Sequence, residues 1–136
     1  MTRREAREQA FTLVFETSFQ NLPVRELIDN AVEGRDLEID DYALEAATAV
    51  QKNQEAIDAI ILQHSTKWKP NRLPRVTLSI LRLAVGELSF VEGVPEGAVV
   101  NEAVELAKKY GSEEDAAYVN GVLGGYLRSK NPSPQE

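Results

Sequence analysis

Apolar residues recur three and four positions apart over most of the 136-residue chain. This spacing places them on one face of an α-helix, whereas a half-buried strand would need them at every second position. No sustained period-two pattern occurs in the sequence. The apolar spacing predicts helices over residues 3–19, 23–32, 41–64, 74–91, 95–111 and 113–127. We therefore expect an all-α fold.

Residues that favour helix ends lie at the predicted boundaries. Thr2 and Glu5 form the Ser/Thr-x-x-Glu pattern that satisfies free amides at a helix start. Pro23 suits a first helical turn and Gly34 a helix stop. Ser112, followed by three acidic residues, predicts a capped start for the last helix.

The length and composition indicate one soluble domain over residues 1–130 with a short tail at 131–136. Apolar residues make up 43% of the chain and charged residues 27%, which is ordinary for globular proteins. The longest apolar runs are far shorter than the ~20 residues that cross a bilayer, and no signal-peptide pattern opens the chain. We expect a cytoplasmic protein that has no contact with a membrane.

The acidic balance is confined to one part of the sequence. The net charge is -7, and residues 29–58 hold nine acidic residues against Arg35 and Lys52, so this segment accounts for all of it. The remainder is neutral overall, with a basic N-terminus and an acid-free basic stretch over residues 67–82. Because local fields steer ligands, the total charge does not exclude a nucleic-acid partner.

Arg3, Arg4 and Arg7 lie in the first two turns of the first predicted helix. Cations oppose the helix dipole there, at a cost of a few tenths to about 1 kcal/mol each, which favours a role other than stability. A solvated first turn is an equal alternative. Single-stranded RNA is commonly held by cations and stacked aromatic rings, for which Trp68 and Tyr118 are candidates. Half-buried core roles remain open for both rings.

Patterns typical of catalysis are absent from the sequence. Cysteine is missing, and the only histidine, His64, lies near a predicted helix end. The acidic groups at Asp40 and Glu113 precede or begin helices, where capping explains them. The glycines at 121, 124 and 125 lack the Gly-Lys-Ser/Thr sequence of a phosphate loop and are more typical of close helix packing or a bend. We expect no enzyme activity, no cofactor and no metal site.

Several blocks of sequence resemble the NusB family of transcription antitermination factors. The N-terminal part matches at Ala6-Arg7-Glu8, Ala10, Trp68, Arg72 and Ile80-Leu81-Arg82-Leu83-Ala84. The more specific C-terminal part matches at Glu87-Leu88, Val94-Pro95, Asn101-Glu102-Ala103-Val104-Glu105-Leu106-Ala107-Lys108, Gly111 and Val119-Asn120-Gly121-Val122-Leu123. The order and spacing of these blocks follow the family.

The resemblance implies a compact bundle of about seven helices in two packed subdomains. It implies binding of boxA-type single-stranded RNA together with NusE, a small-subunit ribosomal protein, within the RNA polymerase antitermination complex. The expected outcome is read-through of terminators, chiefly in ribosomal RNA operons. By the same resemblance, Arg3, Arg4 and Arg7 bind RNA phosphates and base edges, and Tyr118 stacks on a base. The helix that begins near Pro74 belongs to the region implicated in NusE contact.

The sequence departs from the family pattern at Glu5, Thr77, Gly86 and Ala117. The acidic balance and Ala117 motivate an alternative, a NusB-fold protein-interaction scaffold with weak or no RNA binding. A third hypothesis is a detached module similar to the RNA-binding domain of ribosomal RNA cytosine methyltransferases. A monomer and a homodimer are both compatible with the sequence.

Overall fold

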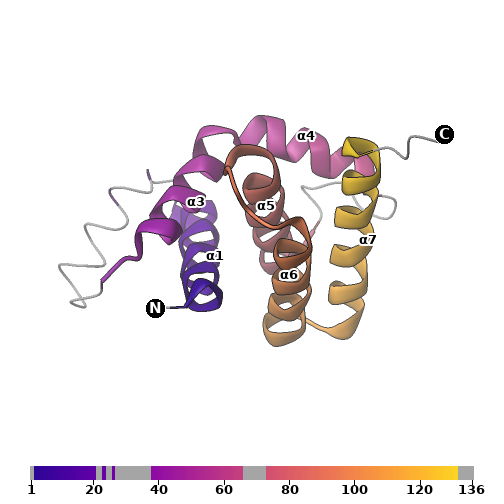
Figure 1. The fold of residues 1–136 in the computed structure, drawn as a ribbon. Helices are drawn as coiled ribbons and strands as arrows, with labels where there is room; N and C mark the ends of the chain where they lie inside the picture. Colours follow the sequence, from indigo (N-terminus) through magenta and orange to yellow (C-terminus); the bar gives the residue numbers. More distant parts are fainter. Residues whose placement is uncertain (1, 21–22, 24–25, 27–37, 66–72, 132–136) are drawn as a thin grey trace.

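The computed structural model describes residues 2–20, 23, 26, 38–65 and 73–131. All secondary structure within these ranges is helical, which confirms the all-α prediction (Figure 1). The helices are α1 (Arg3–Gln20), α3 (Asp41–Lys52), α4 (Gln54–His64), α5 (Arg75–Phe90), α6 (Glu96–Tyr110) and α7 (Glu113–Lys130). The connector over 67–72, the tail from residue 132 and, apart from residues 23 and 26, the predicted helix over 23–32 lie outside the described residues.

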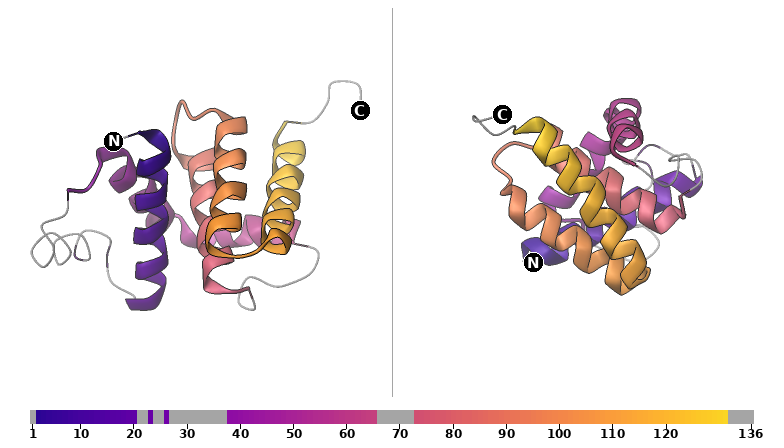
Figure 2. Two further views of the ribbon diagram at one scale, coloured as in Figure 1. Left: turned by 90° about the horizontal axis from the view of Figure 1, so that it is seen from below. Right: turned by 90° about the vertical axis from the view of Figure 1, so that its right-hand side faces the viewer.

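Helix α5 lies at the centre of the bundle and contacts each of the other described helices. Figures 1 and 2 show α1 and α3 on one side of α5, α7 on the other, and α6 alongside. Its buried residues face several directions, as a central helix requires: Thr77, Ser79, Ile80, Leu81, Leu83, Ala84, Val85, Gly86, Glu87 and Leu88. Burial of Glu87 among these apolar residues requires a partner for its charge.

The helix starts follow the predicted capping chemistry. The Glu5 amide donates to Thr2 Oγ1 at 3.1 Å, and the Thr2 amide donates to Glu5 Oε1 at 3.0 Å. Asp40 caps α3 by accepting from the Tyr42 amide at 2.8 Å, and Ser112 caps α7 by accepting from the Asp115 amide at 3.1 Å. Glu5, which interrupts the arginine cluster, therefore has a structural function at the start of α1.

The prediction of one continuous helix over 41–64 is wrong, because the helix is interrupted at Asn53. The Asn53 side chain donates to the Ala49 carbonyl at 2.8 Å, which ends α3, and α4 begins at the next residue. A Cβ on Gly86 of α5 would lie 2.7 Å from Val50 Cγ2 and 3.5 Å from Ile57 Cδ1. The interruption thus allows side chains before and after Asn53 to bury against the same point of α5.

Close packing explains only one of the glycines that the sequence singled out in α7. A Cβ on Gly125 would lie 3.3 Å from His64 Nδ1, so this glycine allows α4 and α7 to approach. Gly121 has no such neighbour within 4 Å, which excludes the same explanation there. None of the described helices combines the length and apolar character that a membrane span needs.

Candidate nucleic-acid interface

The three arginines of α1 have three different environments. Arg3 is exposed, and its guanidinium carbon lies 3.8 Å from the centre of the Tyr42 ring on α3. The Nε of Arg4 is 3.1 Å from each carboxylate oxygen of Glu102 on α6, and 68% of the Arg4 side chain is exposed. Arg7 is buried, with 6% of its side chain exposed. Only Arg3 and Arg4 present their charge at the surface.

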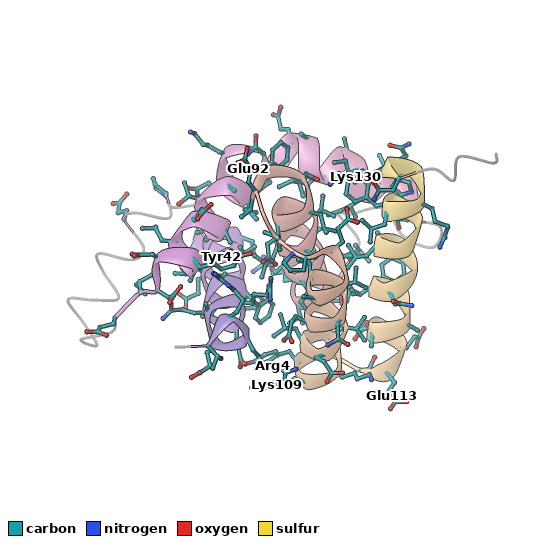
Figure 3. The ribbon with its side chains drawn as sticks, in the orientation of Figure 1. Arg4, Tyr42, Glu92, Lys109, Glu113 and Lys130 are labelled. Carbon is teal, nitrogen blue, oxygen red and sulfur yellow. The ribbon has the colours of Figure 1, made fainter. Side chains whose placement is uncertain are left out.

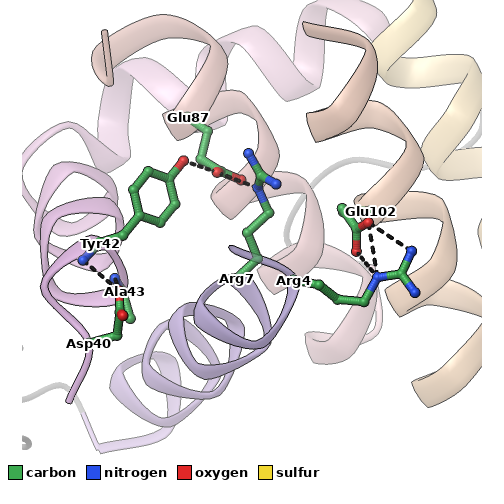
Figure 4. A network of polar contacts seen from close by, with 7 residues as sticks. All are labelled: Arg4, Arg7, Asp40, Tyr42, Ala43, Glu87 and Glu102. Carbon is green, nitrogen blue, oxygen red and sulfur yellow. Dashed lines mark hydrogen bonds and ion pairs between the residues drawn. The ribbon is translucent and has the colours of Figure 1, made fainter. Parts of the chain in front are cut away.

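A buried network joins α1, α3 and α5 (Figure 4). Arg7 Nε donates to Glu87 Oε1 at 2.8 Å, and the Tyr42 hydroxyl donates to the same oxygen. The Glu87 side chain is only 2% exposed, so its charge depends on these two partners. Burial, followed by the hydrogen bond to Glu87, raises the pKa of Tyr42 well above its ordinary value, which keeps the hydroxyl a donor at neutral pH.

The pairing with Glu87 bears on the predicted phosphate contact of Arg7. Glu87 takes up the Nε donor of Arg7, and this buried carboxylate would lose its cation if a phosphate drew the guanidinium away. Local spacing could not reveal the pairing, because Glu87 lies 80 residues further along the chain. Its pairing with Glu87 gives Arg7 a structural role in holding Tyr42 and α1, and its contact with RNA stays a prediction.

A second set of polar contacts joins α1 to the end of α6. Lys109 Nζ lies 2.6 Å from Glu8 Oε1, and the Tyr110 hydroxyl donates to the same oxygen. The hydrogen bond from Lys109, followed by that from Tyr110, lowers the pKa of Glu8. The Lys109 side chain is 58% exposed and lies with Arg4 at the lower end of the bundle in Figure 3. Sequence reasoning missed Lys109 because nothing local connects it to α1.

Tyr118 lies on α7, away from the arginines. Its side chain is half-buried, and its hydroxyl shares a hydrogen bond with Ser65, the residue that caps the end of α4. Figures 1 and 2 show α5 and α6 between α1 and α7. The structure therefore does not gather the predicted RNA-binding residues into one pocket.

The remaining candidates of the sequence analysis have structural explanations or lie outside the described residues. Arg82, in the basic stretch, pairs with both carboxylate oxygens of Asp58 on α4 at 2.8 Å. His64 Nε2 lies 3.5 Å from the Ser129 hydroxyl and belongs to the contact between α4 and α7. Trp68 is not among the described residues. Within the described part of the chain, no group of three or more His, Cys, Asp or Glu side chains could hold a metal ion.

Residues 4–128 match the model of the NusB family. That range spans every described helix apart from the terminal residues of α1 and α7. The chain belongs to the NusB family. The resemblance read from the sequence blocks is thereby confirmed.

Individual NusB proteins align with nearly the whole chain. The transcription antitermination protein NusB of Clostridium novyi is 39% identical over 133 residues, which cover 95% of this chain and 100% of the relative. The protein of the same name from Acetivibrio thermocellus is 41% identical over 132 residues, which cover 96% of this chain and 91% of the relative. The alignments leave no large part of these NusB proteins unmatched.

Solved NusB structures share the fold. A crystal structure of the antitermination factors NusB and NusE in complex with dsRNA contains a chain that superposes with a TM-score of 0.81 and 31% identity, covering 95% of this chain and 99% of the other. T. maritima NusB superposes with a TM-score of 0.79 and 30% identity, covering 99% and 95%. The helical arrangement of this chain is therefore that of NusB.

Proposed function

We propose that this chain is a transcription antitermination factor that binds boxA-type single-stranded RNA together with NusE. Acting within the RNA polymerase antitermination complex in the cytoplasm, it promotes read-through, chiefly in ribosomal RNA operons, and it does so without catalysis. The observation that carries the proposal is the match over 95% of this chain to a chain of the crystal structure of NusB and NusE in complex with dsRNA. The names of the aligned relatives support the same role.

Arg3 and Arg4 are the proposed phosphate contacts on α1. Both are exposed in the first turn of the helix. Glu102 already holds Arg4 through two oxygens, and a phosphate offers the same fork-shaped arrangement of acceptors. Binding of RNA would then replace the Glu102 carboxylate with a phosphate at the Arg4 guanidinium, with the donors arranged as before. Tyr118, whose side chain is half-buried, is the proposed stacking residue on α7.

The modest number of exposed cations on α1 explains why NusE would be needed for full affinity. Each neutralised phosphate of a single strand contributes about -0.7 to the slope of log affinity against log salt. Two arginines therefore supply a slope of about -1.4, which corresponds to weak binding. The net charge of -7 further opposes long-range attraction of RNA.

Binding measurements with and without NusE test the proposal. A boxA-like single strand and a scrambled strand are titrated at several salt concentrations, and we expect preference for the boxA-like strand that strengthens with NusE. Replacing Arg3 and Arg4 together with alanine should flatten the salt slope by about 1.4. Lys52→Ala, which removes an exposed cation from α3, is the matched control. An unchanged slope in the double variant would argue against the phosphate contacts.

The scaffold alternative is favoured by a specific observation. Both exposed arginines of α1 already have partners within the protein, Tyr42 for Arg3 and Glu102 for Arg4, and the exposed residue before Tyr118 is the uncharged Ala117. In this alternative the chain binds NusE, but the pair gains no preference for boxA RNA. The same titrations distinguish the two, since only the scaffold would give equal binding to both strands.

A further inference from the structure

Two grooves border Arg3 on the surface formed by α1, α3 and the loop between α5 and α6. One groove, of about 480 Å³, is lined by Thr2, Asp40 and Asp41 as well as Arg3 and Tyr42. The other, of about 460 Å³, combines Arg3 and Tyr42 with an apolar wall from the loop and the start of α6: Val91, Val94, Pro95 and Ala98. We call this second groove the loop groove. Its volume lies in the range of small-molecule sites.

Tyr42 presents Arg3 to the loop groove in a defined position. The Tyr42 hydroxyl is held by Glu87, which is itself held by Arg7, so the ring is anchored at its buried end (Figure 4). The guanidinium of Arg3 lies against this ring at 3.8 Å from its centre. Guanidinium planes and aromatic rings are the surfaces on which unpaired bases stack. Because the pair is already in place, little conformational freedom is lost when a base stacks on it.

The charges at the groove distinguish between the parts of a nucleotide. Glu45 and Glu92, which are both exposed, line the loop groove together with Arg3 and Arg7. Carboxylates repel a phosphate but accept hydrogen bonds from the amino groups of bases. The apolar wall suits the flat faces of a base in the same way. The carboxylates and the apolar wall of the groove therefore suit a base, while Arg3 can still contact the phosphate next to that base.

We propose that the loop groove is a slot for one unpaired nucleobase of the bound RNA. The base stacks on Arg3 and Tyr42 against the wall formed by Val94 and Ala98, and its exocyclic amino group is held by Glu45 or Glu92. The inference rests on the proposed function, because it takes RNA as the ligand. It adds a base contact on the α1 side of the molecule, separate from Tyr118 on α7.

An abasic scan tests the slot. Each position of a fluorescent boxA-like 12-mer is replaced in turn by an abasic site, and its affinity for the complex with NusE is measured. One stacked base contributes a factor of about 5 to 150 in affinity. A second position, in addition to the one stacked by Tyr118, should therefore lose affinity by such a factor when it is made abasic. Ala98→Phe, which fills the groove, should abolish the loss at that position alone. Ala59→Phe, at an exposed site on α4, is the matched control and should leave the scan unchanged.

A second variant covers the case in which Ala98→Phe does not fold, as judged from its melting curve. Replacing Glu45 and Glu92 together with glutamine changes only exposed side chains. For the wild type we expect tighter binding when the slot position carries guanine than when it carries inosine, which lacks the amino group. The double variant should lose that difference. A difference that persists would overturn the assignment of the two carboxylates and the slot with it.

The outcomes separate this inference from the proposed function. Identical abasic scans for the wild type and Ala98→Phe, with preference for boxA-like RNA retained, would overturn the slot and leave the antitermination role standing. Absence of any preference for boxA-like RNA in the wild-type complex would overturn both. The slot would be supported if the loss of affinity caused by an abasic site disappeared in Ala98→Phe at one position and persisted at the others.

Discussion

Replacing Arg7 with alanine would leave the Glu87 carboxylate buried without its cation. The Glu87 side chain is 2% exposed, and water cannot replace the guanidinium without opening the contact between α1 and α5. The Tyr42 hydroxyl would remain as a neutral donor to the carboxylate. Removing one partner of a buried ion pair costs about 3 to 5 kcal/mol of unfolding free energy, because the charge that remains is uncompensated.

For a chain of this length, that loss corresponds to a melting temperature lower by about 10 to 20 °C. Urea unfolding followed by circular dichroism measures the free energy directly. Arg4→Ala is the matched control, since it removes an arginine from the same helix. The Arg4 side chain, which pairs with Glu102, is largely exposed. Exposed pairs contribute at most about 1 kcal/mol, so this variant should remain close to the wild type. Equal losses in the two variants would refute the reasoning.

A combined replacement separates the charge effect from simple loss of packing. Arg7→Met, Tyr42→Phe and Glu87→Leu together remove every polar member of the network while keeping most of its volume. Buried ion networks replaced by apolar residues are often as stable as the original, so the triple variant should recover most of the loss. A triple variant as unstable as Arg7→Ala would show that packing, and not the unpaired charge, dominates.

Further predictions concern the helix contacts and the response to pH. Gly86→Ala would place a Cβ 2.7 Å from Val50 Cγ2 and should lower the unfolding free energy measured in urea by about 1 to 3 kcal/mol. Gly121→Ala, with open space around the added Cβ, should raise it by about 0.5 to 1 kcal/mol. Equal effects of the two substitutions would contradict the close approach at Gly86. The lowered pKa of Glu8 implies stability that is present above its ordinary pKa of 4.5 and is lost as the pH falls through the folded value. The stability difference between the wild type and Glu8→Gln should therefore shrink on acidification below pH 4.5 in acid unfolding series, and a constant difference would contradict the ion pair with Lys109.

The candidate site shows where single-sequence reasoning stops. The spacing of Arg3, Arg4 and Arg7 made them one basic cluster, and the family resemblance gave them one role. The structure gives each a different partner, contributed by α3, α6 and α5 respectively. Those partners lie between 39 and 98 positions away, and no local pattern connects residues at such separations. For the same reason, the sequence did not single out Tyr42 as a candidate site residue.

Local features were determined by the sequence alone. The helical spacing of apolar residues predicted the all-α class, and the caps at Thr2, Asp40 and Ser112 were confirmed because capping depends on residues two or three positions apart. Tertiary structure alone decided the burial of Arg7 and the close approach of Val50 and Ile57 to α5. Both depend on what α5 presents to its neighbours, a carboxylate at Glu87 and a missing side chain at Gly86. Packing between distant segments sets these outcomes, and a periodicity within one segment carries no information about them.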